Sequence, residues 1–326
     1  MKHVVKDMLS FLGRLALSAA LMAWLFTQID WKDITTAVRG ADPVLLFWAF
    51  VVTVAIQFVV LWRWAIFMWA LNLQAPLGQV CRYFFIGLFC NLFLPTSIGG
   101  DVVKAIGLSR GVGQKPKVFA SVVLDRLSGF AGLVIVALLA YVVGTRIVDA
   151  PSVLVPIVVL TVLSVTIGGI LFSRRIYAIG CRVFHKIPKA HKALLDMHND
   201  VLLMTGRKRT GFGCIALSCL IQILGAFLYY LIGRALHLEA SFLHYLIFAP
   251  IVGAITFLPS IGGLGVREVG WVYFLAKVGV DKGAAASLSL ISFFFVIICG
   301  LIGGVVYVTT VSDRRIQSDP QGPAAD

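Results

Sequence analysis

The sequence predicts an all-α polytopic membrane protein with an inverted structural repeat, made of six full spans plus two re-entrant broken helical hairpins. These are eight helical hydrophobic segments in one transmembrane domain, residues 1–326. Three observations predict this fold. Hydrophobic residues make up 60% of the chain and charged residues only 13%, which is too little polar surface for a soluble globule. A Pro-Gly motif occurs twice, and Lys and Arg gather in particular segments.

The six full spans are apolar runs of about 20 residues or more, the length that a helix needs to cross a hydrocarbon core about 30 Å thick. The first run has no small-residue cleavage site, so we expect an uncleaved span rather than a signal peptide. The spans lie near residues 8–28, 44–61, 118–144, 152–173, 211–233 and 283–310.

The broken segments are 77–113 and 242–279, each an apolar run interrupted by the repeated motif. The motif reads FLPTSIGGDVVKAIG from Phe93 and FLPSIGGLGVREVG from Phe257. Its two SIGG tetrapeptides are half a chain length apart, which indicates duplication. We therefore place repeat one at about 1–147 and repeat two at about 148–312.

The orientation follows from a basic amphipathic linker at 174–210, which the positive-inside rule places in the cytoplasm with both termini. Three full spans per half is an odd number, so the second half is inserted upside down. Parity does not distinguish half-depth hairpins from full crossings, but we favour hairpins, because unwound backbone at membrane depth needs protein or a wet cavity around it. The tail, 313–326, is expected to be disordered.

The linker is expected to lie on the anionic inner leaflet, as an interfacial helix at 176–187 and a second amphipathic stretch through Leu194, Met197, Val201 and Met204. The alternative is a solvated basic face. The net charge of +13 does not indicate nucleic-acid binding, because the basic residues flank spans and no recognition module accompanies them.

The repeated motif places glycines and a cation at the start of a helix. A helix N-terminus binds anions through its backbone N–H groups and its dipole, so two such starts could hold a phosphate near the midplane. The alternative is that the glycines permit close helix packing and that Lys104 pairs with Asp101. The residues concerned are Gly99, Gly100 and Lys104 in the first copy, and Gly262, Gly263, Gly265 and Arg267 in the second.

Other polar residues within apolar segments have two interpretations each. Asp125 and Arg126 could pair within the bundle or contact substrate. Glu268 is a candidate proton carrier or, as we favour, the counter-charge of Arg267. The polar amides Gln57, Asn91 and Gln222 could line a polar path or form hydrogen bonds between helices. The GxxxG pair of Gly300 and Gly304 indicates close helix packing.

Motifs for soluble catalysis are missing from the sequence. It has no Walker A pattern, no G-x-S-x-G elbow and no His/Cys metal spacing, so we expect neither an enzyme nor a cofactor. The six cysteines are interpreted as small packing residues.

The paired motifs, together with the Asp-Arg at 125–126, resemble the lysylphosphatidylglycerol synthase transmembrane-region family, the flippase domain of the multiple peptide resistance factor. The resemblance covers nearly the whole chain. It implies a bacterial or archaeal cytoplasmic-membrane protein that moves lipids between leaflets. The resistance factor continues into an aminoacyl-transferase domain, so we do not expect this chain to aminoacylate lipid alone. The family's functional positions would be Gly99, Gly100, Asp101, Asp125, Arg126, Gly262, Gly263, Gly265, Arg267 and Glu268.

Two functions stay open on the sequence. The first is a flippase or scramblase that takes the headgroup phosphate of an anionic phospholipid or a polyprenyl-phosphate lipid into a central cavity. The second is a membrane enzyme, or an accessory subunit of glycolipid-synthesis enzymes, acting on polyprenyl-phosphate substrates. For the second, the sequence offers only Asp101 and Asp125 as catalytic carboxylates. A homo-oligomer is a further expectation.

Overall fold

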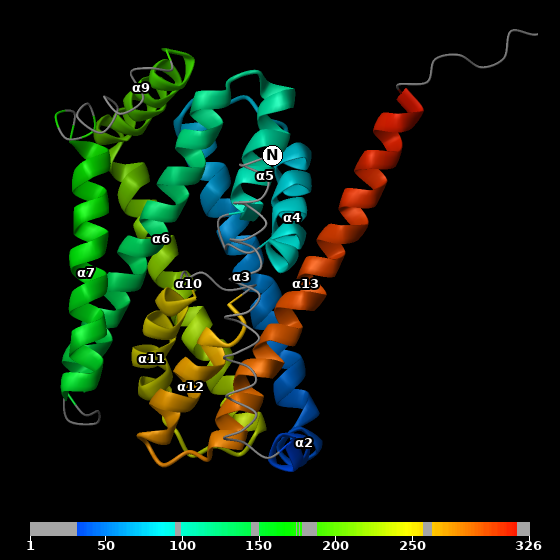
Figure 1. Ribbon diagram of the computed structural model, residues 1–326, viewed down its shortest axis with the longest axis vertical. Helices are drawn as coiled ribbons and strands as arrows, with labels where there is room; N and C mark the ends of the chain where they lie inside the picture. The colour runs from blue at the N-terminus through cyan, green and yellow to red at the C-terminus, as the bar shows by residue number, and fades with distance from the viewer. Residues whose placement is uncertain are drawn as a thin grey trace, which may run out of the picture.

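The computed structural model describes residues 31–94, 99–144, 150–173, 175, 177, 188–256 and 263–317, and these form helices and turns without a strand. Five of the described helices are long and apolar enough to cross a membrane (Figure 1). They match five of the six predicted spans, and the remaining predicted span, 8–28, lies outside the described residues. The five are α3 (Pro43–Ala70), α6 (Lys115–Gly144), α7 (Ala150–Phe172), α10 (Lys208–Ala235) and α13 (Lys282–Gln317).

Each predicted broken segment is a pair of short helices. The first pair is α4 (Leu77–Phe93) and α5 (Gly99–Val112), and the second is α11 (Phe242–Ile255) and α12 (Val266–Ala276). At 1.5 Å per residue they run from about 17 to about 26 Å, which is less than a hydrocarbon core of about 30 Å. The two pairs lie toward opposite ends of the bundle (Figure 1).

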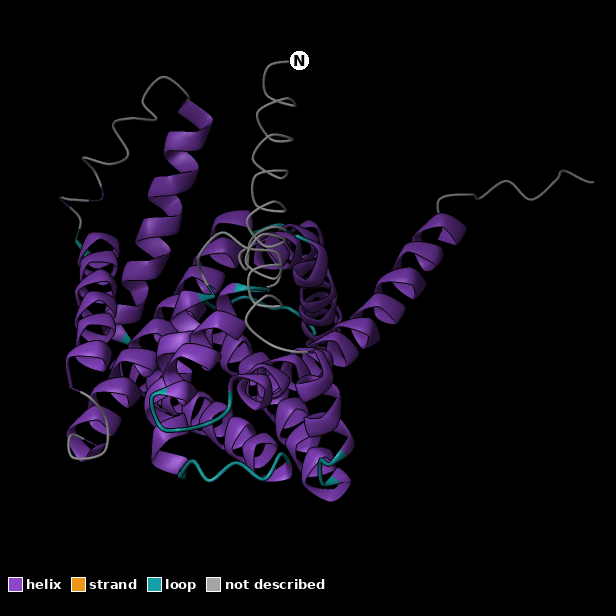
Figure 2. Cartoon of the chain, turned by 60° about the horizontal axis from the view of Figure 1, so that its bottom comes forward, coloured by secondary structure: helices purple, strands orange, loops and turns teal. Residues whose placement is uncertain are grey.

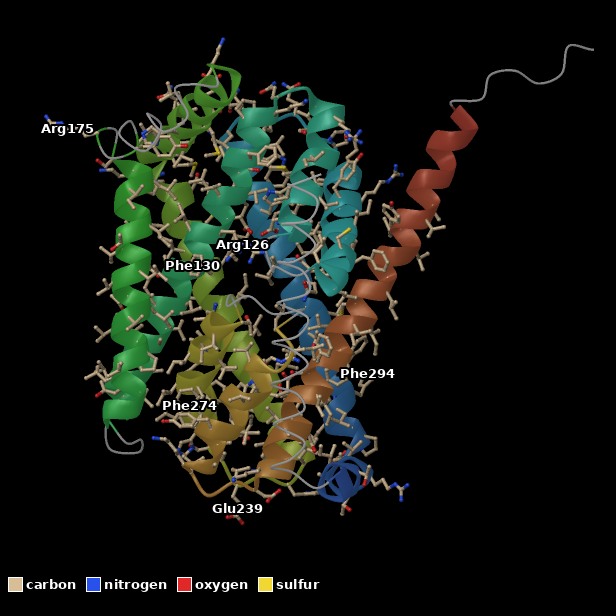
Figure 3. The ribbon with its side chains drawn as sticks, in the orientation of Figure 1. Arg126, Phe130, Arg175, Glu239, Phe274 and Phe294 are labelled. Atoms are coloured by element: carbon tan, nitrogen blue, oxygen red, sulfur yellow. The ribbon has the colours of Figure 1, made fainter. Side chains whose placement is uncertain are left out.

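The bundle has two ends, which we name by the short helices found there. At the α2 end, α2 (Trp31–Arg39) precedes α3, and the Asp42 N–H donates to the Ala235 carbonyl over 2.9 Å, which joins the start of α3 to the end of α10. At the α9 end, α9 (Pro188–Leu203) and the 3₁₀ turn η2 (Met204–Gly206) connect α7 to α10. Figure 3 shows Arg175 at the α9 end and Glu239 at the α2 end.

The core is divided between these ends. Toward the α2 end, α10, α11 and α12 bury large side chains such as Tyr245, Phe248 and Trp271. Toward the α9 end, a second cluster includes Trp64 on α3 and Leu108 on α5. The polar site described below lies on α3, α5 and α6, which also supply residues of the second cluster.

Glycines bring α13 directly against α4. A Cβ on Gly300 would lie 2.4 Å from the Leu92 side chain, and one on Gly303 would lie 2.0 Å from the carbonyl oxygen of Phe85. The predicted close packing at Gly300 and Gly304 is therefore confirmed. The C-terminal part of α13, which follows this contact, stands away from the other helices in both views (Figures 1 and 2).

Two features differ from the expectations for the linker and the tail. The apolar side of α9 and η2 packs on protein, since Val201 of α9 and Met204 of η2 are buried in the α9-end core and Met197 of α9 packs against it. This side therefore does not face the inner leaflet. Apart from Tyr177, residues 176–187 lie outside the described part of the chain. The helix α13 continues to Gln317, so 313–317 are helical rather than disordered.

Candidate functional site

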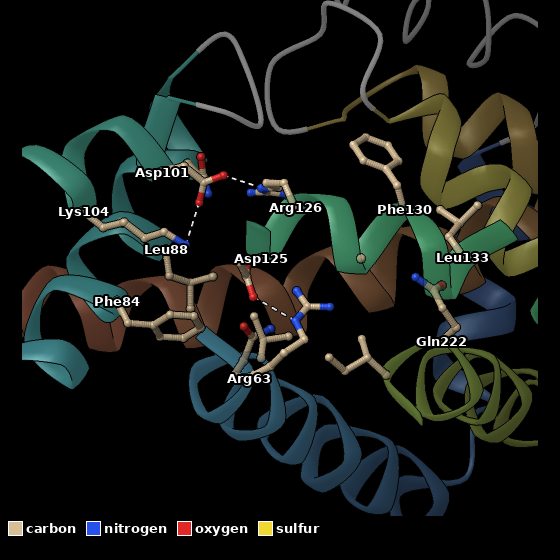
Figure 4. Close-up of a pocket in the computed structure, with 16 residues that line it drawn as sticks. Arg63, Phe84, Leu88, Asp101, Lys104, Asp125, Arg126, Phe130, Leu133 and Gln222 are labelled. Carbon is tan, nitrogen blue, oxygen red and sulfur yellow. Dashed lines mark hydrogen bonds and ion pairs between the residues drawn. The ribbon is translucent and has the colours of Figure 1, made fainter. Parts of the chain in front are cut away.

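A polar cavity of about 250 Å³ lies between α3, α4, α5, α6 and α10 (Figure 4). Five charged side chains line it, together with polar amides that the sequence singled out. Figure 3 shows Arg126 and Phe130 near the middle height of the bundle. The charged residues are Arg63, Asp101, Lys104, Asp125 and Arg126, and the amides are Gln57, Asn91 and Gln222.

The first motif positions α5 by close packing. A Cβ on Gly100 would lie 2.1 Å from the carbonyl oxygen of Gly87 on α4, so only glycine permits this approach. The Gly100 N–H donates to Asn91 Oδ1 over 2.8 Å. This N–H at the start of α5 therefore has a protein partner, and α5 presents Asp101 and Lys104 to the cavity. Gly99 begins the helix and packs near Leu94.

Asp101 connects α5 to α6. Its Oδ1 lies 2.9 Å from Lys104 Nζ, as the packing alternative predicted, and its Oδ2 accepts from Arg126 Nε (Figure 4). Lys104 Nζ also lies 4.7 Å from the centre of the Trp64 ring, which favours the cation in an apolar setting. Asp101 therefore neutralises part of two cations at once.

A second ion pair connects α3, α6 and α10. Arg63 Nε lies 2.8 Å from Asp125 Oδ1, and a terminal guanidinium nitrogen of Arg63 donates to Ser218 Oγ over 2.7 Å. Sequence reasoning missed Arg63, because it ended the predicted span at residue 61 while α3 continues to Ala70. An arginine between two tryptophans in an apolar run was the available signal. Asp125 and Arg126 thus each have a partner within the bundle, Arg63 and Asp101 respectively, and contact with substrate stays a prediction.

Among the described side chains that line the cavity, cations outnumber carboxylates. Three cations, Arg63, Lys104 and Arg126, stand against two carboxylates, Asp101 and Asp125, which leaves a formal charge of +1. The Arg126 side chain is 35% exposed, whereas the other four are 4–7% exposed. An anion that enters the cavity would therefore meet Arg126 first.

The second motif forms a separate, closed network. Glu268, fully buried, lies 2.6 Å from Arg267 and accepts the Gly265 N–H over 2.7 Å. Arg267 Nε also donates to Ser289 Oγ on α13 over 3.0 Å. Gly265 has φ of 85°, a conformation that favours glycine. The counter-charge interpretation of Glu268 is confirmed.

The structure thus brings together only part of the predicted site. Asp101, Lys104, Asp125 and Arg126 line one cavity, and the side chains of Arg267 and Glu268 are not among the described residues that line it. Gly263 has φ of 79° in the turn before α12. Gly262 lies outside the described residues.

Among the described residues, no group of three or more His, Cys, Asp or Glu side chains is placed to hold a metal ion. The described cysteines are free, and two of them, Cys214 and Cys299, are buried.

Fold and cavity together define a multi-pass membrane protein whose helices enclose a charged cavity. The family model of the lysylphosphatidylglycerol synthase transmembrane region matches residues 11–304, and the chain belongs to that family. Similar proteins include a UPF0104 membrane protein of Pyrococcus horikoshii, 26% identical over 282 residues that cover 76% of this chain and 82% of the relative. A UPF0104 membrane protein of Methanothermobacter thermautotrophicus is 26% identical over 341 residues, covering 96% and 98%.

Proposed function

We propose that the protein is a lipid flippase or scramblase-like transporter that moves an anionic lipid between the leaflets of a cytoplasmic membrane. The observation that carries this proposal is the polar cavity, where five charged side chains lie among helices long and apolar enough to cross a membrane. Ionisable groups at membrane depth are costly, and they are typically retained for substrate pathways. A lipid phosphate would contact Arg126, the most exposed of the five charged side chains, while its chains stay in apolar surroundings.

The two repeats would have different roles in this transporter. The first motif, through Asp101 and Lys104, forms part of the wall of the open cavity, whereas Arg267 and Glu268 of the second satisfy each other and tie α12 to α13. We therefore place the phosphate beside Arg126 rather than between Lys104 and Arg267. The inverted repeat remains part of the proposal, because the two short-helix pairs lie toward opposite ends of the bundle (Figure 1).

The enzymatic alternative has one observation in its favour, which is that Asp101 and Asp125 share a cavity with Arg126. However, Asp101 is bonded to two cations and Asp125 to Arg63. A general base must contact the proton that it abstracts, whereas both of these carboxylates contact cations of the protein. The geometry accordingly favours transport.

A reconstituted flipping assay tests the proposal. The purified protein is reconstituted into liposomes that contain a fluorescent phosphatidylglycerol. It should move this lipid from the inner to the outer leaflet, where a membrane-impermeant quencher removes its fluorescence. Replacing Arg126 by Gln should slow this movement at least about tenfold, since a charge-assisted hydrogen bond contributes about 1.5–3 kcal/mol. Lys104 remains to neutralise Asp101, so the variant should stay folded.

Arg110→Gln is the matched control, because Arg110 is an exposed arginine on α5 outside the cavity. It should flip lipid at the wild-type rate. Transport by Arg126→Gln at the wild-type rate, with thermal stability unchanged, would contradict the proposed phosphate position.

A further inference from the structure

A second cavity, which we name the α7–α10 cavity, lies in the gap between these two helices. Its volume is about 400 Å³, and α6 supplies the largest share of its wall. Helix α7 packs mainly on α6 and α9 and makes little contact with α10, and it lies at one side of the bundle (Figure 1). Of the described residues that line the polar cavity, only Phe130 also lines this one. The two cavities are therefore separate sites.

The wall of the α7–α10 cavity is mainly apolar. No charged side chain is among the described residues that line it, and the Ser128 hydroxyl donates to the Asp125 carbonyl of its own helix over 2.8 Å. Gly168 on α7 and Gly211 on α10 leave the space open, because a Cβ on either would have nothing within 4 Å. Val165, also on the wall, is 68% exposed. The cavity therefore opens to the side of the bundle and suits a hydrocarbon occupant.

The dimensions of the cavity fit one lipid chain. Its wall on α6 extends from Leu124 to Ile135, which is about 16 Å at 1.5 Å per residue. This is roughly half of a hydrocarbon core of about 30 Å, the depth that the chains of one leaflet occupy. A partner helix about 10 Å across would fill about 1,200 Å³ over the same length, well above the volume of the cavity.

Cations stand at the α9 end of this cavity. Lys208 begins α10 and is exposed. It precedes Gly211 by three positions and Ile215 by seven, so the three residues share one face of the helix. Gly211 and Ile215 line the cavity, and the neighbouring Arg209 is exposed as well. Figure 3 shows Arg175 at the same end, beyond α7. A headgroup at this end would meet positive charge.

We infer that the α7–α10 cavity holds one chain of an anionic phospholipid whose headgroup lies at Lys208. This lipid joins α7 to α10 as a resident of the fold. It is not the transported substrate, so the inference goes beyond the proposed function and does not depend on it. The cavity selects a chain by its shape, and a cation near the membrane surface favours an anionic headgroup about fivefold.

Photocrosslinking of the full-length protein tests this site. The protein is placed in phosphatidylcholine nanodiscs with a small fraction of phosphatidylglycerol that carries a diazirine on one acyl chain, and labelled residues are mapped by mass spectrometry. We expect labels on the wall, at Ile135 and Val165, about fivefold above those from a phosphatidylcholine probe with the same chain. Val162, exposed on α7 outside the cavity, should be labelled alike by both probes. Equal labelling of the wall by both would overturn the inference, because it describes ordinary boundary lipid.

Filling the cavity tests the chain site. Gly168→Leu should lower the phosphatidylglycerol labels on the wall at least about tenfold, because the new side chain takes the space of the lipid. Gly169→Leu is the matched control, since Gly169 has equally open surroundings and does not line the cavity. Should Gly168→Leu fail to fold, Gly211→Leu fills the cavity from α10, with Gly213→Leu as its control. Wall labels that persist in the filled variant would overturn the chain site.

Removing the charge tests the headgroup position. Lys208→Gln should abolish most of the fivefold preference of the wall for phosphatidylglycerol over phosphatidylcholine. Lys282→Gln should keep this preference, because Lys282 also begins a helix but lies at the α2 end. An unchanged preference in Lys208→Gln would overturn the headgroup position.

One further variant separates this lipid from the transported one. Arg126→Gln should leave the wall labels unchanged, because Arg126 lines the polar cavity and not the α7–α10 cavity. Loss of these labels in Arg126→Gln would assign them to the transported lipid and overturn the inference. Intact labels in a protein that moves no lipid in the flipping assay would support the inference and contradict the proposed function alone.

Discussion

At the residue scale, the ion pair between Arg63 and Asp125 links stability to the cavity. Both side chains are buried, and removal of one partner leaves an uncompensated charge. We predict that Arg63→Gln or Asp125→Leu alone lowers the free energy of unfolding by about 3–5 kcal/mol. The double replacement Arg63→Met with Asp125→Leu should recover most of that loss. Thermal unfolding of the purified variants in detergent gives the comparison, and single variants as stable as wild type would show that the pair is dispensable.

The sequence predicted most of the residues at this site, for a definite physical reason. Ionisable residues are rare in apolar segments, so Asp101, Lys104, Asp125 and Arg126 were identified without a structure. The sequence could not predict that Asp125 pairs with Arg63, because these residues are 62 positions apart in the chain. It also could not show that the two motif copies have different environments, since Glu268 closes the second copy through side-chain geometry.

At the scale of elements, the contact of α13 with α4 depends on glycine. A Cβ on Gly303 would lie 2.0 Å from a backbone oxygen, whereas one on Gly169 in α7 would have nothing within 4 Å. We predict that Gly303→Ala costs about 1–3 kcal/mol through overpacking. Gly169→Ala should be neutral, or stabilising by up to about 1 kcal/mol through helix propensity. Denaturant titration in mixed micelles measures both, and equal effects would mean that α13 does not pack on α4 in the membrane.

Helix α9 shows what periodicity leaves undetermined. The pattern through Met197, Val201 and Met204 predicted an amphipathic helix, and these residues do share a buried side. The same pattern describes a helix on lipid and a helix on protein, because either surface buries apolar side chains. Spans of about 20 apolar residues do not have this ambiguity, which is why α3, α6, α7, α10 and α13 lie close to their predicted positions.

At the scale of the whole molecule, the loops of the two ends differ in charge. At the α9 end, Lys115 and Lys117 begin α6, and the linker up to Arg209 is rich in Lys and Arg. At the α2 end, the connection from α10 to α11 contains Glu239, and the one from α12 to α13 contains one cation, Lys277, and one carboxylate, Asp281. From the positive-inside rule, which counts Lys and Arg near the span ends, we predict that the α9 end lies in the cytoplasm.

This orientation predicts the labelling of two exposed positions. After the six native cysteines have been replaced by Ala or Ser, Glu239→Cys should react with an impermeant maleimide on intact cells. Gln114→Cys, in the turn between α5 and α6, should react only after permeabilisation. The α4–α5 pair would then enter from the cytoplasm and the α11–α12 pair from outside, as an inverted repeat requires. Labelling of both positions from the same side would contradict the spanning arrangement, and the reverse pattern would invert the direction in which lipid phosphate reaches Arg126.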